Sequence, residues 1–164
     1  MKLEHATTEM LLFRQKRQDV GLLYDLFFEY VSVEVGKGKP SIPDRFTLTA
    51  AFACVFDHDL KLVSGLCSFT PAVHILSGRI ILRFLPHHWL SWHDENHIID
   101  VLPLDGMYGV SVPQAIVQRR EMMRYFPSKG IFPTDWDDTK KASFDNSVSD
   151  VVAILEELME KVPF

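Results

Sequence analysis

The chain has 164 residues, of which 47% are hydrophobic, 12% are aromatic and 24% are charged, and its formal net charge is -5. These values argue against disorder and favour a single domain over residues 1–164, which would bury roughly 70% of its unfolded surface. The acidic balance offers no basic field for nucleic acid, two cysteines exclude a disulfide-built scaffold, and no run reaches the roughly 18 apolar residues of a membrane span.

Three helices are predicted in the first third of the chain. One covers Thr7–Arg17, and a second covers about Gln18–Val33, where leucines and aromatic residues recur at helical spacing. The stretch Gly36-Lys37-Gly38-Lys39-Pro40 is expected to end the second helix, because glycine and proline both oppose helix continuation. A third helix is predicted over about residues 43–56, opened by a proline and an aspartate.

The middle of the chain is typical of β-strands. Leu60–Phe69, Arg79–Trp92 and His97–Leu102 are rich in isoleucine, leucine, phenylalanine and tryptophan. The polar group His93-Asp94-Glu95-Asn96 is expected to form the turn between the last two strands. These segments therefore predict an antiparallel meander of about three strands.

Helices are predicted again towards the C-terminus. Ser111-Val112-Pro113-Gln114 matches a capping box with a proline in the first turn, and predicts a helix as far as about Tyr125. Pro127–Phe144 is expected to be irregular, and Ser147 or Ser149 is expected to cap a final amphipathic helix. The predicted class is α+β, with N-terminal helices, a central antiparallel sheet of about three or more strands and further C-terminal helices.

The most informative polar residues are a histidine and an aspartate on neighbouring predicted strands. His87 and Trp89 share one face of their strand, because side chains alternate. A two-residue turn at Asp94-Glu95 would place Trp89 opposite Asp100 and bring Asp100 within side-chain reach of His87. A three-residue turn would move Asp100 to the other face, and such pairs also serve as local structural hydrogen bonds, so both alternatives stay open.

A carboxylate that holds an imidazole is the orienting half of a nucleophilic triad. The order of a helix, the segment Val63-Ser64-Gly65, a strand with His87-His88-Trp89 and a strand with Ile98-Ile99-Asp100 resembles the transglutaminase-like branch of the papain-like cysteine protease superfamily. The resemblance covers about residues 44–103. It implies a papain-like fold in which His87 is the base and Asp100 orients it, while a cysteine attacks an amide or acyl carbonyl.

The nucleophile is where the chain departs from this family pattern. The family cysteine lies at the start of the helix, where the helix dipole lowers the pKa of the thiol. Here that start is Pro43-Asp44-Arg45-Phe46-Thr47, and the helical cysteine, Cys54, comes about 10.5 Å further along. A helix that began later would restore Cys54 as the nucleophile; otherwise Thr47 or Ser41 would have to replace it.

The surroundings of the two cysteines favour a structural role. The apolar neighbours of Cys54, which are Phe52, Val55 and Phe56, indicate a buried thiol, and Cys67 lies on a predicted strand. The N-terminal residues do not resemble a secretory signal peptide. We therefore expect a cytoplasmic protein with both thiols reduced.

The histidines raise a rival chemistry. His93-Asp94-Glu95-Asn96-His97 resembles a zinc motif, and His88 lies nearby in sequence, but the glutamate is one place late and the segment is predicted to be a turn. Histidines on an exposed turn are more typical of solvated surface, so we expect neither a metal nor a cofactor.

Two functions remain. The first is a cysteine-type amidase, peptidase or acyl transferase that acts on an amide-containing substrate through Cys54, His87 and Asp100. The second is a non-catalytic member of the same fold that binds a protein or small ligand in the former active-site groove. Neither a nucleic acid nor a membrane is expected as partner, and the sequence leaves open whether His87 or His88 faces the groove.

Overall fold

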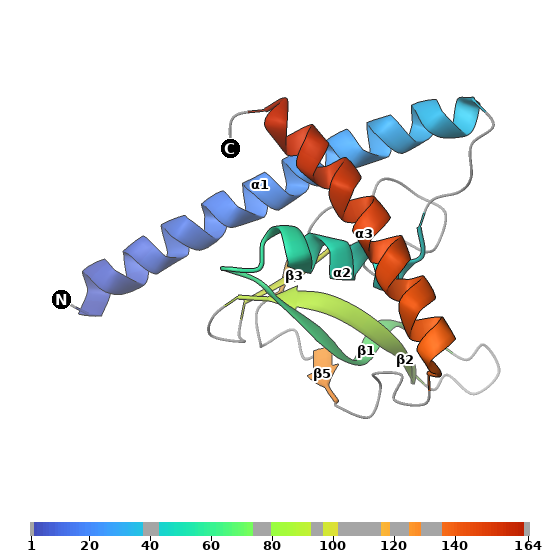
Figure 1. The fold of residues 1–164 in the computed structure, drawn as a ribbon. Helices are drawn as coiled ribbons and strands as arrows, with labels where there is room; N and C mark the ends of the chain where they lie inside the picture. The colour runs from blue at the N-terminus through green and yellow to red at the C-terminus, as the bar shows by residue number, and fades with distance from the viewer. Residues whose placement is uncertain are drawn as a thin grey trace.

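The computed structural model describes residues 2–37, 43–73, 80–92, 97–101, 116–118, 125–128 and 136–162. Its elements in chain order are α1 (Lys2–Gly36), α2 (Arg45–Val55), β1 (Lys61–Val73), β2 (Ile80–Ser91), β3 (Ile98–Asp100), β4 (Ile116–Gln118), β5 (Tyr125–Pro127) and α3 (Asp138–Glu160) (Figure 1). The predicted α+β class is therefore confirmed. In the described part of the chain, no helix is long and apolar enough for a membrane crossing.

The first two predicted helices are one continuous helix, α1, which ends at Gly36 as expected. The predicted boundary between Arg17 and Gln18 is wrong. Both residues are good helix formers, and neither is a glycine or a proline that would end a helix. Gly21 is accommodated inside the helix. One face of α1 is buried in the core through Phe13, Val20, Leu23, Tyr24, Phe27 and Val31.

The predicted third helix is confirmed as α2. Asp44 caps its start, because the side-chain carboxylate accepts hydrogen bonds from the backbone N–H of Thr47 at 2.8 Å and from its hydroxyl at 3.1 Å. The helix ends at Val55, where the N–H of Phe56 still donates to the carbonyl of Phe52. Every residue of this helix from Thr47 to Phe52 is buried.

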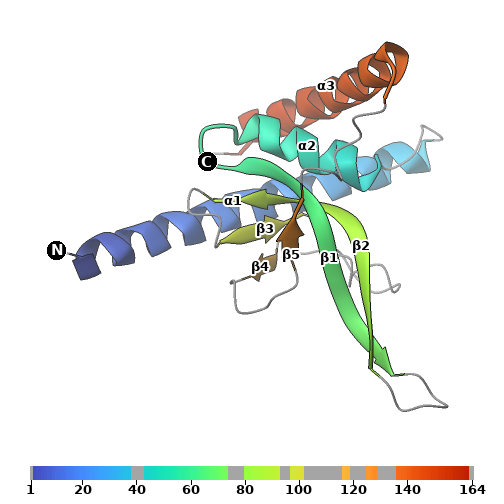
Figure 2. The ribbon, with the colours of Figure 1, turned by 90° about the horizontal axis from the view of Figure 1, so that it is seen from below.

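The described strands form one sheet in the order β4-β3-β2-β1-β5, and neighbouring strands in it are antiparallel. The predicted meander of three strands is confirmed by β1, β2 and β3, which are neighbours in the sheet. The β1–β2 pairing runs from Lys61 opposite Ser91 to Val73 opposite Ile80. The far part of this pair projects from the sheet as a two-stranded ribbon (Figure 2).

The helix predicted from Ser111 to Tyr125 is wrong over the residues that the structure describes. Ile116–Gln118 is strand β4, paired with β3, and Tyr125 begins strand β5, paired with β1. The β-branched residues Ile116 and Val117 suit a strand, and pairing with the sheet overrides the local capping signal. The capping-box residues themselves lie outside the described ranges.

The final helix, α3, begins earlier than predicted. Asp137 is its N-cap and accepts a hydrogen bond from the N–H of Lys140 at 2.7 Å. The predicted caps are wrong, since both Ser147 and Ser149 lie inside the helix. The Ser147 hydroxyl bonds to the carbonyl of Ser143 one turn back at 3.0 Å. The predicted apolar stripe is correct and supplies the buried residues Val151, Leu155 and Leu158.

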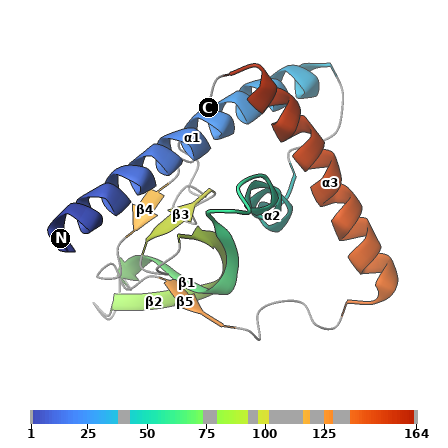
Figure 3. The ribbon, with the colours of Figure 1, turned by 60° about the vertical axis from the view of Figure 1, so that its left-hand side comes forward.

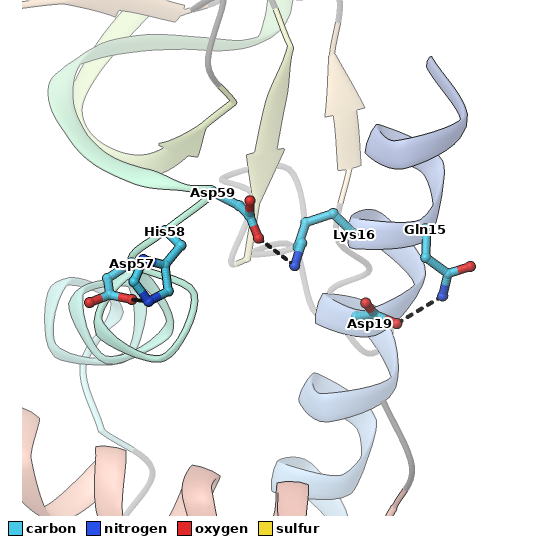
Figure 4. Close-up of polar contacts among 6 residues, drawn as sticks. All are labelled: Gln15, Lys16, Asp19, Asp57, His58 and Asp59. Carbon is cyan, nitrogen blue, oxygen red and sulfur yellow. Dashed lines mark hydrogen bonds and ion pairs between the residues drawn. The ribbon is translucent and has the colours of Figure 1, made fainter. Parts of the chain in front are cut away.

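The helices cover one face of the sheet. Helix α2 contacts β1 and β2 directly, and α3 packs on both α2 and α1 (Figure 3). An ion pair of 2.6 Å between Lys16 on α1 and Asp59, in the turn after α2, ties α1 to the connection into β1 (Figure 4). This arrangement leaves the start of α2 beside the central strand β2.

Candidate functional site

His87 and Asp100 meet as the predicted register requires. Leu90 lies opposite Ile99 and Ser91 opposite Ile98 in the β2–β3 pair, which places Asp100 on the face that carries His87. The His87 Nε2 atom is 2.8 Å from Asp100 Oδ2, and the two side chains are only 2% and 0% exposed. The predicted turn at residues 94–95 lies outside the described ranges, but the predicted contact is confirmed.

A third residue, the partly buried Tyr125, contacts the same pair. Its hydroxyl donates a hydrogen bond of 2.7 Å to the same Asp100 oxygen that bonds to His87. Its ring lies edge-on to Trp89 at 5.1 Å between centroids, and 6.4 Å from the ring of His87. Sequence reasoning missed Tyr125 because it placed this residue at the end of a helix, although two aromatic residues before a proline are typical of an edge strand.

Gly65 permits the close approach of β5. It lies opposite His87 on one side and opposite Pro127 on the other. A Cβ atom at this position would overlap the carbonyl oxygen of Phe126 and would lie 2.7 Å from Trp89 Cη2 and 2.8 Å from Pro127 Cα. Only glycine therefore lets the strand that carries Tyr125 reach the aromatic side of the cluster.

His88 faces the start of α2. Its Nδ1 atom is 2.8 Å from the hydroxyl of Ser64, and its ring is stacked on Phe46 with 3.9 Å between centroids. Burial, with a smaller contribution from His87, lowers the pKa of His88 to about 4, although nearby Asp44 opposes the shift. His88 is therefore neutral at pH 7 and serves to hold α2 against the sheet.

A pocket of about 560 Å³ lies where α2 begins beside β2, and it is lined by Pro43, Asp44, Arg45, Phe46, Pro86, His87 and His88. Both candidate histidines are among the lining residues, but their rings lie on opposite faces of β2: the ring of His88 stacks on Phe46, and the ring of His87 lies with Trp89 and Asp100. The N-terminal end of α2, where the resembling family would place its thiol, carries the Asp44 cap and Phe46 instead. Thr47 is 3% exposed and its hydroxyl is bonded to Asp44, so it does not reach the pocket as a nucleophile. Ser41 lies outside the described residues.

Cys54 lies in the last turn of α2 and its side chain is exposed. The expectation of a buried Cys54 is wrong, because Phe52 and Phe56 face the core and Cys54 projects from the other side of the helix. Partial burial of the side chain raises the pKa of the Cys54 thiol, and the negative charge of Asp57 raises it by a smaller amount. The buried cysteine is Cys67 on β1.

The structure brings His87 and Asp100 together and leaves Cys54 apart from them. Phe46 stacks on His88, the neighbour of His87, and Cys54 follows eight residues later. At the rise of an α-helix this separation is about 12 Å along the axis. Since α2 begins at Arg45 and is continuous to Val55, the later helix start that would restore Cys54 as a nucleophile is wrong.

The rival metal site finds no support among the described side chains. His97 packs its ring against Phe13 at 4.8 Å, and His88 is engaged by Ser64 and Phe46. Within the described ranges no three His, Cys, Asp or Glu side chains are close enough to hold a metal ion. Residues 93–96 lie outside those ranges.

Comparison with known proteins returns no matching family model, no similar curated protein and no similar solved structure.

Proposed function

We propose that the chain is a non-catalytic binding protein, which holds an amide-containing ligand or a peptide segment of a partner in the pocket between the start of α2 and residues 86–88 of β2. One observation carries the proposal: this pocket has Asp44 and Phe46 at its helix end and His88 on its strand side, while Cys54 lies at the other end of α2. Among the described residues, the lining of the pocket includes no cysteine, serine or threonine.

The donor and acceptor groups around the pocket suit an amide. His88 lines the pocket with its ring stacked on Phe46, and its Nδ1 atom is 2.8 Å from the hydroxyl of Ser64. A neutral imidazole has one N–H donor and one acceptor nitrogen, and a hydroxyl can donate or accept. The second ring nitrogen of His88 is therefore suited to either the N–H or the carbonyl of an amide.

The opposite side of the pocket suits the amide oxygen. The first N–H groups of a helix have no partner within the helix, and its N-terminus carries partial positive charge. The Asp44 cap uses the N–H of Thr47, while Arg45 and Phe46 occupy the first turn beside the pocket. Phe46 and two prolines add the apolar walls that are typical of small-ligand sites.

The test is a titration of the ¹⁵N-labelled protein with N-methylacetamide, the simplest secondary amide that spans both groups. We expect saturable chemical-shift changes at Arg45, Phe46 and His88. His88→Gln keeps a hydrogen-bonding group for Ser64 but removes the ring, and should weaken binding. His58→Gln, which alters a ring that is 95% exposed, is the matched control. Shifts that do not saturate, or that are the same in the His88 variant, would contradict the proposal.

An activity assay on the same protein samples tests the catalytic alternative. N-methylacetamide and a p-nitroanilide of an acetylated amino acid are incubated with the wild type and with Cys54→Ser, and release of amine is measured. No release is expected from either protein. Release by the wild type that is abolished by Cys54→Ser or by His87→Gln would instead establish a cysteine-type amidase, peptidase or acyl transferase.

A further inference from the structure

We infer that α1 is an interaction surface for a second copy of this chain, and that the two α1 helices pack antiparallel about Leu22. Helix α1 lies along the outside of the molecule (Figure 1). The inference does not depend on the proposed function, because none of the residues that line the pocket lies on α1.

Three exposed apolar side chains form a stripe along α1. Leu11, Leu22 and Val33 are 59%, 42% and 52% exposed and follow one another at intervals of 11 residues. Eleven residues make about three turns of an α-helix, so the stripe turns by only about 20° between members and stays on one side for about 33 Å. Buried residues such as Val20 and Phe27 lie on the opposite side of the helix. The stripe is therefore an apolar surface outside the core, which is typical of an interaction site.

The stripe is complementary to itself when two helices run in opposite directions. With Leu22 opposite Leu22 of the second copy, Leu11 of each chain lies level with Val33 of the other. Leu12 and Tyr30 are also exposed, and their separation of about five turns places both on one flank of the stripe. Across the two-fold axis they lie within about 3 Å of the same level. A symmetric dimer requires this kind of self-complementarity.

The exposed charges of α1 change sign at Leu22. Among the described side chains of this helix, the exposed charged residues before Leu22 are Arg14 and Arg17, and those after it are Asp25 and Glu29. Antiparallel packing places the basic half of one helix beside the acidic half of the other, whereas parallel packing would place like charges together. This charge complementarity favours a second copy as the partner and sets its direction.

One pair of these charges flanks the stripe directly. Arg14 follows Leu11 by three residues and Glu29 precedes Val33 by four, so each lies beside a member of the stripe. In the antiparallel dimer Arg14 lies within about 1.5 Å, along the axis, of the level of Glu29 of the second copy. The two-fold axis repeats this contact at both ends of the apolar seam.

The test is sedimentation equilibrium of the 164-residue chain at low salt over a range of concentrations. The wild type is expected to associate reversibly to twice its mass of 18.9 kDa. Leu22→Glu brings two like charges together at the two-fold axis and should raise the dimer dissociation constant by about tenfold or more. A wild type that stays monomeric at the highest attainable concentration overturns the inference.

The matched control is Met10→Glu. Met10 is 41% exposed, nearly the same as Leu22, but it lies about 100° round the helix from Leu11 and therefore off the stripe. This substitution should change the dissociation constant by less than about twofold, because only Leu22 lies at the seam. Equal effects of Met10→Glu and Leu22→Glu would contradict the assigned surface.

Charge reversal tests the direction of the helices and covers the case in which Leu22→Glu does not fold. Arg14→Glu or Glu29→Arg alone places like charges at both ends of the seam and should weaken the dimer by about fivefold at low salt, and by less at high salt. The double variant Arg14→Glu/Glu29→Arg should recover the wild-type affinity. A single reversal that strengthens the dimer, or a double variant as weak as the single ones, would overturn the antiparallel arrangement.

Discussion

The two ends of α2 carry different side chains and have different surroundings. The N-terminal end lies beside an oriented histidine and carries an aspartate cap and a phenylalanine. The C-terminal end carries an exposed cysteine, whose pKa is raised by partial burial and by Asp57. The thiol of Cys54 and the histidines of the pocket therefore lie at opposite ends of one helix. The position of a residue along a helix decides whether it belongs to a site.

The largest expected effect is on the approach of β5 to the His87 end. Gly65→Ala places a Cβ against the backbone of Phe126 and Pro127 and against Trp89, none of which can move without shifting a strand. We expect a loss of about 3 kcal/mol in the free energy of unfolding, measured by urea denaturation. The Tyr125 contact with Asp100 should be lost with it.

The matched control is Gly21→Ala on α1. An added Cβ there meets nothing within 4 Å, so the substitution should stabilise the helix by about 0.5–1 kcal/mol. Equal effects of the two substitutions would show that β5 does not depend on Gly65.

A smaller effect is expected at the cap of α2. Asp44→Ala removes an acceptor of two hydrogen bonds from Thr47 and should destabilise the protein by about 1–2 kcal/mol in thermal or urea unfolding. Asp137→Ala removes the corresponding cap of α3, where the carboxylate accepts from the N–H of Lys140. We expect the smaller loss at Asp137, because this cap is exposed. A larger loss at Asp137 would contradict the central place of α2.

The pH dependence of stability tests the packing of His88 beside the cap. The folded-state pKa of about 4 lies below the ordinary histidine pKa of 6.5, so the unfolded chain binds the proton more readily. The stabilising contribution of neutral His88 is complete above pH 6.5 and is lost as the pH falls towards 4. His88→Phe should flatten the unfolding free energy across this window, and His58→Gln should not. A profile that stays equally steep without His88 would assign the slope to other groups.

The contact of His87 with Asp100 could be predicted because it depends on local rules. Side-chain alternation and the register of one short hairpin place the two residues on the same face. Asp44 as a helix start could be predicted for a similar reason, since a proline and an aspartate before an apolar run are a local signal. The α+β class followed from the same kind of pattern.

The role of Tyr125 could not be predicted, because it depends on pairing between strands far apart in the sequence. The capping box at Ser111 is a local helix signal, and the residues that follow it pair with β3 and β1 instead. The start of α3 at Asp138 was missed for another reason: Asp137 is a good cap, but the prolines before it favoured an irregular segment. The exposure of Cys54 needed the orientation of α2 on the sheet.

The smallest expected effect on the protein, and the sharpest test of the two ends of α2, is alkylation of Cys54. Because the thiol pKa is raised, iodoacetamide should react slowly at pH 7 and faster as the pH increases, with Cys54 modified before the buried Cys67. Asp57→Asn should accelerate the reaction at fixed pH, since it removes a charge that opposes the thiolate. Alkylated protein should bind N-methylacetamide as before, because the pocket lies at the other end of α2. Rapid alkylation at pH 7 that is slowed by His87→Gln would mean that the thiol and the imidazole act together, and the binding function would have to give way to the enzyme.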